Sequence, residues 1–206
     1  MKQPLNIILL GDPGSGKATQ AAYFVKKYDL YDFDTGRELT LAREKNKKID
    51  TILIHNYDVG KLAPTKIVRK IMRDKIFRHP KGQGILFDGT PKMLGEAKLV
   101  HSWMRANGRT NVIFFYLSIP REAIVERVLK RKGYEVGKKY KKREMDSIAA
   151  LKNRAVYYKK NIKEVVDFFS KHYSYNEING MGTRLQVRRR IQKVIDQYLK
   201  QREQVH

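Results

Sequence analysis

The feature that most constrains the fold is a short apolar segment, residues 5–10, that leads directly into the glycine-rich sequence GDPGSGK at 11–17. Glycines at 11, 14 and 16 allow the backbone N–H groups of such a loop to turn toward one anion, and Lys17 adds a mobile positive charge. A helix that begins at this lysine points the positive end of its dipole at the same anion. A plain turn between a strand and a helix is the alternative, but it requires neither the lysine nor this spacing. The sequence therefore predicts a phosphate-binding loop, with a nucleoside triphosphate as its ligand.

The loop departs from the general phosphate-binding pattern at one position. That pattern has Ser or Thr directly after the lysine to hold Mg²⁺, whereas this chain has Ala18 and then Thr19. A second candidate metal ligand is Asp88, which ends the apolar segment 85–87, although an aspartate there also suits a turn or a helix cap. Mg²⁺ accepts few protein ligands and several waters. We therefore expect Asp88 and Thr19 to hold Mg²⁺ through water.

Apolar and β-branched segments alternate with segments of helical character along the chain. The expected strands are 5–10, 84–87, 111–118 and 173–178, and the expected helices are 17–28, 65–78, 94–107, 120–132, 145–172 and 183–202. This alternation predicts an α/β fold in which a doubly wound parallel sheet carries helices on both faces. Two stretches, 34–80 and 132–142, do not fit the alternation, and we interpret them as insertions over the cleft.

The charge balance is strongly basic, because 44 Lys and Arg face 21 Asp and Glu, a formal net charge of +23. Nucleotides account for cations inside a cleft, and the excess predicts salt-dependent binding to RNA or other anionic surfaces. The arginine-rich C-terminal segment is, however, also explained as a solvated helix face. The absence of cysteine excludes disulfides and thiolate metal sites, and the apolar runs are too short to cross a bilayer. We expect a monomeric cytoplasmic protein.

Several sequence blocks, in order, match one family: GDPGSGKATQ at 11–20, FDTGRELT at 33–40, VGKLAPTKIV at 59–68 and GILFDGTPKMLGEA at 84–97. Arginines at matching spacing follow at positions 127, 131, 143 and 154. The chain resembles adenylate kinase and the related nucleoside monophosphate kinases over essentially its whole length. The resemblance implies a P-loop kinase core at 1–33, 81–131 and 144–206, a helical monophosphate-binding insertion at 34–80 and a short lid at 132–143.

The resemblance also implies a reaction, reversible in-line phosphoryl transfer from Mg-ATP to AMP that yields two ADP, and roles for individual residues. The implied catalytic cations are Lys17, Arg127, Arg131, Arg143 and Arg154. ATP would contact Gly11, Pro13, Gly14, Ser15, Gly16, Lys17, Ala18, Thr19 and Arg127. The monophosphate would contact Thr35, Gly36, Arg37, Thr40, Leu62, Ala63, Gly89, Lys92 and Glu96.

The acceptor side departs from the family pattern at three positions. Thr40 and Lys92 stand where the family usually has arginines, so two bidentate phosphate contacts are lost, and Arg37 is a candidate replacement one turn before Thr40. Glu96 stands where the family usually has Gln, and a carboxylate only accepts hydrogen bonds. These changes leave two alternatives open: a kinase for GMP, CMP or UMP, and a degenerate relative that binds nucleotide or RNA with little turnover.

Overall fold

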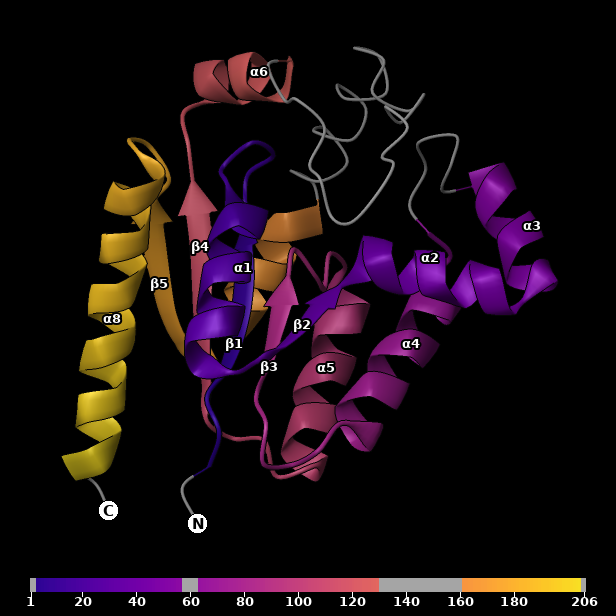
Figure 1. Ribbon diagram of the computed structural model, residues 1–206, viewed down its shortest axis with the longest axis horizontal. Coiled ribbons are helices and arrows are strands. Elements are labelled where there is room, and N and C mark those ends of the chain that lie inside the picture. Colours follow the sequence, from indigo (N-terminus) through magenta and orange to yellow (C-terminus); the bar gives the residue numbers. More distant parts are fainter. Residues whose placement is uncertain (1–2, 57–62, 130–160, 205–206) are drawn as a thin grey trace.

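The computed structural model describes residues 3–56, 63–129 and 161–204. Its centre is a sheet of five strands in the order β2-β3-β1-β4-β5, and every neighbouring pair is parallel (Figure 1). The strands are β1 (Asn6–Gly11), β2 (Tyr31–Asp34), β3 (Ile85–Asp88), β4 (Val112–Ser118) and β5 (Ser174–Asn179). β2 and β3 lie on one side of β1, and the chain then crosses over so that β4 and β5 lie on the other side. Such a reversal leaves a crevice at the carboxyl ends of the strands, where α/β sheets bind ligands.

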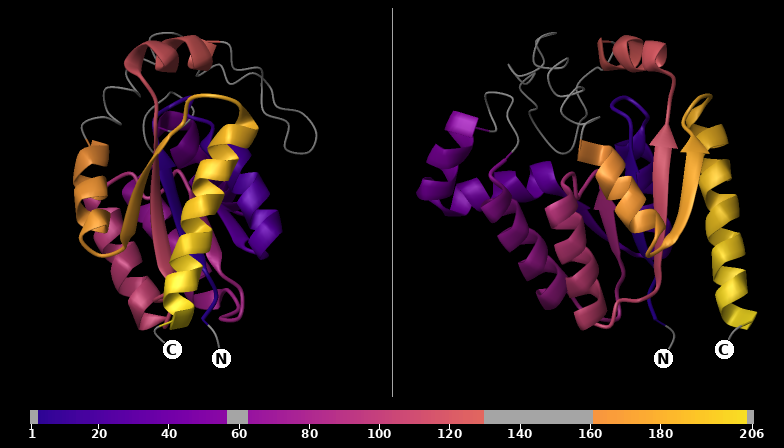
Figure 2. Two further views of the ribbon diagram at one scale, coloured as in Figure 1. Left: turned by 90° about the vertical axis from the view of Figure 1, so that its left-hand side faces the viewer. Right: turned by 180° about the vertical axis from the view of Figure 1, so that it is seen from behind.

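Each face of the sheet is covered by its own layer of helices (Figure 2). Ile8 and Leu10 of β1 point into one layer and Ile7 and Leu9 into the other, as the period of two in a strand requires. The first layer contains α4 (Thr65–Arg78), α5 (Leu94–Ala106) and the helical residues 161–170. The second contains α1 (Lys17–Tyr28) and α8 (Arg184–Gln204). The doubly wound parallel sheet predicted from the sequence is confirmed.

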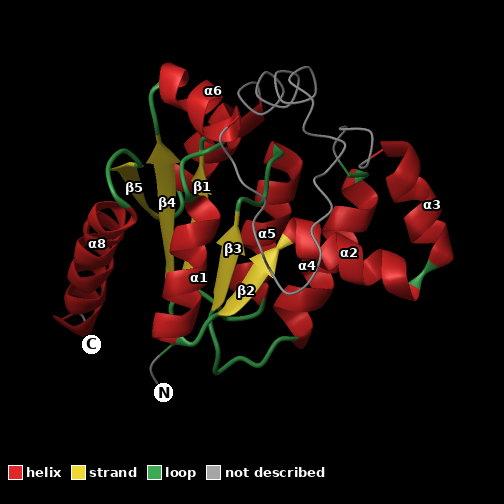
Figure 3. Cartoon of the chain, turned by 45° about the horizontal axis from the view of Figure 1, so that its top comes forward, coloured by secondary structure: helices red, strands yellow, loops and turns green. Residues whose placement is uncertain are grey.

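The remaining described helices lie at the carboxyl end of the sheet or beyond its edge. They are α2 (Thr35–Lys45), α3 (Lys47–Asn56) and α6 (Arg121–Leu129). The α2 and α3 helices project sideways from the sheet as an arm, whereas α4 packs on the sheet face (Figure 3). The expected lid at 132–143 and most of the expected helix 145–172 lie outside the described residues.

One strand was absent from the sequence prediction. β2 has only four residues, and two of them are aspartates, a residue type that is depleted in strands. Phe33 is fully buried in the core, while Asp34 caps α2 by accepting a hydrogen bond from Arg37 N at 2.6 Å. Both aspartates therefore accept hydrogen bonds from Arg37 in the helix that follows, and the strand continues through them.

A buried carboxylate joins the arm to the rest of the fold. Glu38 of α2 is 4% exposed and accepts a hydrogen bond from the Tyr31 hydroxyl at 2.5 Å. Its second oxygen lies 3.1 Å from Nζ of Lys75 on α4. A buried carboxylate needs such partners because its desolvation is costly.

Among the described residues, no helix is both long enough and apolar enough to span a membrane.

Candidate active site

The glycine-rich loop connects β1 to α1 at the carboxyl edge of the sheet. Gly11 has φ 151°, and a Cβ on it would lie 2.3 Å from the carbonyl oxygen of Leu117, so only glycine fits so close to β4. Gly16, with φ 91°, occupies the position before α1. Asp12 N donates to Leu117 O at 2.9 Å, which fixes the start of the loop against β4. The loop thus has the backbone shape that the sequence predicts for a phosphate cradle.

Lys17 lies folded back over this loop. Its ammonium donates to the carbonyl oxygens of Gly11 and Asp12 at 2.6 and 2.8 Å. Its Cε is 3.7 Å from the position of a Cβ on Gly89, which follows β3. The structure therefore brings the lysine, the loop and the end of β3 together, although they are separated by more than 70 residues in sequence.

Asp88 ends β3 beside this lysine, in register with Leu9 of β1 and Asp34 of β2. Burial is the main reason that its pKa is raised to about 7; the Lys17 charge opposes this rise, and the charge of Asp34 adds to it. A carboxylate with a raised pKa beside a lysine favours a further cation, because a cation compensates for the desolvation. Its oxygen donor suits Mg²⁺, so the site fits the metal that the sequence analysis expects.

The other expected metal ligand, Thr19, lies in the first turn of α1 and is half-buried. Ser15 of the loop is 2% exposed, and its Oγ has no hydrogen-bond partner among the described residues. Within the same residues, no group of three or more His, Asp or Glu side chains is arranged to hold a metal. A magnesium ion here would therefore rely on Asp88, substrate oxygens and water.

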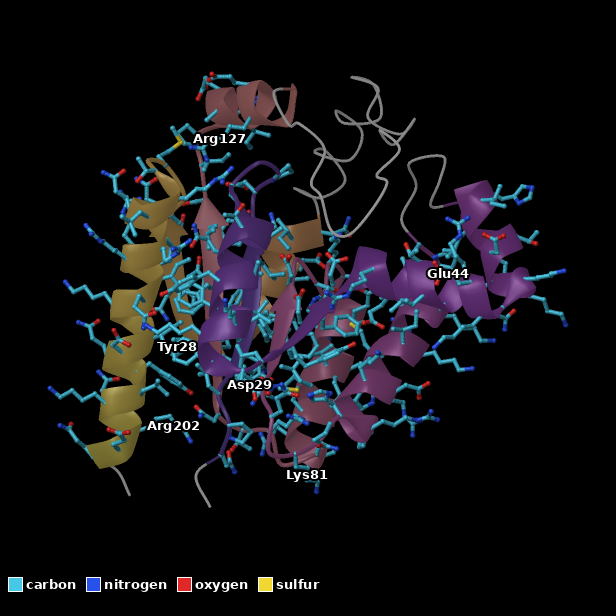
Figure 4. The ribbon with its side chains drawn as sticks, in the orientation of Figure 1. Tyr28, Asp29, Glu44, Lys81, Arg127 and Arg202 are labelled. Carbon is cyan, nitrogen blue, oxygen red and sulfur yellow. The ribbon has the colours of Figure 1, made fainter. Side chains whose placement is uncertain are left out.

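Two side chains tie the loop to β4 and β5. Asp12 accepts hydrogen bonds from the Tyr116 hydroxyl at 2.8 Å and from Ile119 N at 2.9 Å. Arg127 of α6 donates to Gly180 O at 3.1 Å and lies 3.5 Å from Gly14 O, directly above the loop (Figure 4). Arg127 is among the residues expected at this site from the sequence, whereas Asp12 is not, because the glycine-lysine pattern does not specify that position. Arg131, Arg143 and Arg154 lie outside the described residues.

The acceptor-side residues of α2 surround the end of β2. Arg37 forms an ion pair with Asp32 at 2.8 Å and also donates to the Asp32 carbonyl oxygen. In this structure its guanidinium is thus bound to β2, and the predicted replacement of a lost arginine requires that this pair open. Thr40 is exposed and donates to Gly36 O at 3.0 Å within its own helix. Thr35, which follows β2 directly, has a buried Oγ1 with no hydrogen-bond partner among the described residues.

Another set of the expected acceptor residues follows β3. Gly89 is buried with φ 65°, and Lys92 N donates to Glu96 Oε2 at 3.3 Å. Glu96 is 4% exposed, and burial raises its pKa against the opposing effects of the Lys92 N–H and charge and of Arg69. Ala63 is partly buried and packs against the core, and Leu62 lies outside the described residues.

A parallel sheet whose first strand enters a glycine-rich loop, with a lysine beside the aspartate of the neighbouring strand, defines the class of P-loop phosphotransferases. The sequence pattern of the family described as adenylate kinase matches residues 9–174. The chain belongs to the adenylate kinase family and is a phosphotransferase.

Named relatives cover nearly all of the chain at modest identity. The adenylate kinase of Phocaeicola vulgatus is 28% identical over 179 residues, which are 87% of this chain and 92% of the relative. That of Bacteroides fragilis is 28% identical over 192 residues, 93% of this chain and 98% of the relative. That of Flavobacterium psychrophilum is 24% identical over 192 residues with the same coverage. The resemblance stated from the sequence blocks is thereby confirmed.

Proposed function

We propose that the protein catalyses the reversible reaction of Mg-ATP with AMP to give two ADP. The observation that carries this proposal is the convergence of Lys17, the glycine loop and Asp88 at the carboxyl ends of the strands. Lys17 Cε lies 3.7 Å from the position of a Cβ on Gly89, the residue after Asp88. Cations and backbone N–H groups at one point stabilise phosphate charge, and phosphoryl transfer needs little else from a protein.

In the proposed reaction an oxygen of the AMP phosphate attacks the γ-phosphorus of ATP in line. The bond from that phosphorus to the β,γ-bridging oxygen breaks, so the donor leaves as ADP and the acceptor becomes ADP. Lys17 exchanges its bonds to the loop carbonyls for bonds to phosphate oxygens. We assign Arg127 to the donor phosphates beside the loop; Arg131, Arg143 and Arg154 belong to the same proposed set on resemblance alone.

Mg²⁺, when bound, supplies charge neutralisation to the β- and γ-phosphates. Asp88 is the residue that we propose to hold it, through water, with Thr19 nearby on the first turn of α1. The acceptor phosphate would meet Lys92 and the start of α2, and the acceptor base would meet Glu96.

A panel of acceptors tests this proposal directly. The purified full chain is incubated with Mg-ATP and AMP, GMP, CMP or UMP in turn, and diphosphate formation is followed by chromatography. We expect AMP to be converted. A protein that converts GMP, CMP or UMP faster than AMP would be a kinase for that acceptor, and the absence of diphosphate with all four would favour a nucleotide-binding relative.

Glu96→Gln is expected to improve AMP binding. An amide pairs with both the N6 amino group and N1 of adenine, whereas the buried carboxylate only accepts hydrogen bonds. Since one hydrogen bond contributes about 1 kcal/mol, we expect the KM for AMP to fall about fivefold while the KM for ATP stays constant. The exposed Glu44→Gln on α2 is the matched control, and an unchanged KM in Glu96→Gln would remove Glu96 from the base site.

Tyr116→Phe is expected to weaken ATP binding. The change removes the hydroxyl that binds Asp12 at 2.8 Å and so loosens the tether of the phosphate loop. We expect the KM for ATP to rise about fivefold, the equivalent of one hydrogen bond of about 1 kcal/mol, with a smaller effect on the KM for AMP. Tyr198→Phe is the control, because it removes a hydroxyl that binds Val112 O at the opposite end of β4. Equal KM changes in both variants would contradict a specific role for the tether.

A further inference from the structure

The outer surface of α4 and α5 carries a concentration of positive charge. On α4, Val68, Met72 and Ile76 are buried against the sheet. The opposite side of the helix presents Lys66, Lys70, Arg73 and Phe77, which are spaced four, three and four residues apart and are all exposed. We use the name α4–α5 basic face for the surface that these four residues form with three further cations. The further cations are Arg69 on α4 and Lys98 and Arg105 on α5.

The two helices form one continuous surface. They contact each other, and the guanidinium of Arg69 lies 2.7 Å from the position of a Cβ on Gly95, which places Arg69 in the groove between them. Exposed Lys98 and Arg105 continue the positive charge along α5. The face thus extends over α4 and α5, on the side turned away from the sheet (Figure 2).

Acidic side chains do not compensate for this charge. Asp74, the one acid of α4, is turned to the hollow between α2 and α4, and Glu96, the one acid of α5, is buried. Within the part of the chain that the structure describes, Lys66, Lys70 and Lys98 form no ion pair. Uncompensated cations at this spacing raise the local concentration of a polyanion and favour its binding by release of counterions.

Phe77 indicates which polyanion fits. Its side chain is 42% exposed, and the guanidinium carbon of Arg73 lies 5.6 Å from the centre of its ring. An exposed aromatic ring among cations provides a stacking surface for an unpaired base, while the cations bind the phosphates on either side. A bilayer is less suited, because Phe77 is the one large apolar side chain that the described residues of α4 and α5 expose, and the apolar side of α4 is buried in the core.

The arginine-rich helix α8, by contrast, uses part of its charge within the fold. Arg188 lies over the ring of Tyr23 at 3.9 Å, and Arg190 donates to the carbonyl oxygens of Asn179 and Met181 at 2.7 and 2.6 Å. Its exposed cations Arg189 and Lys193 are on the same helix as Asp196. This helix therefore supplies a control surface of similar charge.

We propose that the α4–α5 basic face binds single-stranded nucleic acid, with Phe77 stacking on a base and Lys66, Lys70 and Arg73 contacting phosphates. This function is independent of the phosphotransfer proposed above, because none of these residues belongs to the phosphate loop or to the acceptor residues. The test measures binding of the full chain to a fluorescein-labelled 20-nucleotide oligouridine. Binding is followed by fluorescence anisotropy at KCl concentrations between 50 and 200 mM.

The decisive variant pair reverses two charges on each surface. We expect Lys70→Glu/Arg73→Glu to weaken binding at least tenfold at 50 mM KCl and to reduce the log–log salt slope by about 1.4, at about 0.7 for each phosphate contact on a single strand. Arg189→Glu/Lys193→Glu on α8 changes the net charge by the same amount and should leave the affinity within about threefold. Phe77→Ala should weaken binding at least fivefold without changing the salt slope.

Phosphotransfer activity and circular dichroism identify any variant that fails to fold, and all three should retain both. Equal losses in the two double variants would overturn the proposal, since net charge alone would then explain the binding. Undetectable binding of oligouridine by the parent protein would also overturn the proposal. Tighter binding to phosphatidylserine vesicles than to oligouridine, with loss in Lys70→Glu/Arg73→Glu, would overturn it in favour of a membrane surface.

Discussion

Lys17→Met is expected to lower kcat for phosphotransfer about a thousandfold, since removal of one preorganised charge from a transition-state site typically costs two to three orders of magnitude. Methionine keeps an unbranched side chain of similar length but cannot donate to the carbonyls of Gly11 and Asp12 or to phosphate. It also removes the positive charge that opposes the raised pKa of Asp88, so that carboxyl becomes harder to ionise. Both effects reduce the capacity of the site for phosphate and for a metal.

The measurement is the steady-state rate with saturating Mg-ATP and AMP, with thermal unfolding as a check of the fold. Lys27→Met is the matched control, because Lys27 is exposed in the last turn of the same helix. Retention of more than a tenth of kcat in Lys17→Met would contradict the assigned role. Oligouridine binding should remain in this variant, which separates the two proposals experimentally.

Lys75→Met is expected to destabilise the fold by about 2 kcal/mol. It leaves Glu38, a 4% exposed carboxylate, with the Tyr31 hydroxyl as its remaining partner among the described contacts. Loss of one partner from a fully buried ion pair costs about 3–5 kcal/mol, and the lower figure reflects the 37% exposure of the Lys75 side chain. Urea denaturation measures this change in the free energy of unfolding.

The double variant Glu38→Met/Lys75→Met provides the internal control. It replaces both charges with apolar side chains of similar length, and such replacements are often neutral or stabilising. We therefore expect its free energy of unfolding to return to within about 1 kcal/mol of the parent. If the double variant is as unstable as Lys75→Met, loss of packing and not the unpaired carboxylate would be the cause.

The same variants probe the acceptor arm. Glu38 lies on α2 three residues after Thr35, so the network of Glu38, Tyr31 and Lys75 holds the helix that carries the proposed acceptor residues. In Lys75→Met we expect the KM for AMP to rise more than the KM for ATP. A larger change for ATP would show that the network acts elsewhere.

The sequence was sufficient to predict the elements that follow general rules of local structure. The strand, loop and helix around Lys17 and the apolar strand before Asp88 are each continuous in sequence, so their periodicity and glycine pattern identify them. The doubly wound parallel class of the sheet follows from the alternation of strands and helices, whereas the strand order was not predicted. β2 was missed because two of its four residues are aspartates that pair with the next helix.

The interactions that hold the site together were beyond sequence reasoning for a different reason. Asp12 and Tyr116 are 104 positions apart, and Glu38 and Lys75 belong to helices that no local pattern places in contact. Nothing in a helical segment marks one glutamate as buried, because its partner is set by tertiary packing. The acid-free outer surface of α4 and α5 likewise emerges only when the buried sides of both helices are known.

The tethers of the phosphate loop have a mechanical consequence. The hydrogen bonds of Asp12 and Arg127 run to β4, to the residue after it and to the loop after β5, whereas the arm of α2 and α3 is joined through Glu38 to β2 and α4. The phosphate loop and the arm are thus anchored to strands on opposite sides of β1. A displacement of the arm would strain the contacts of Glu38 with Tyr31 and Lys75 and leave the contacts of Asp12 and Arg127 in place.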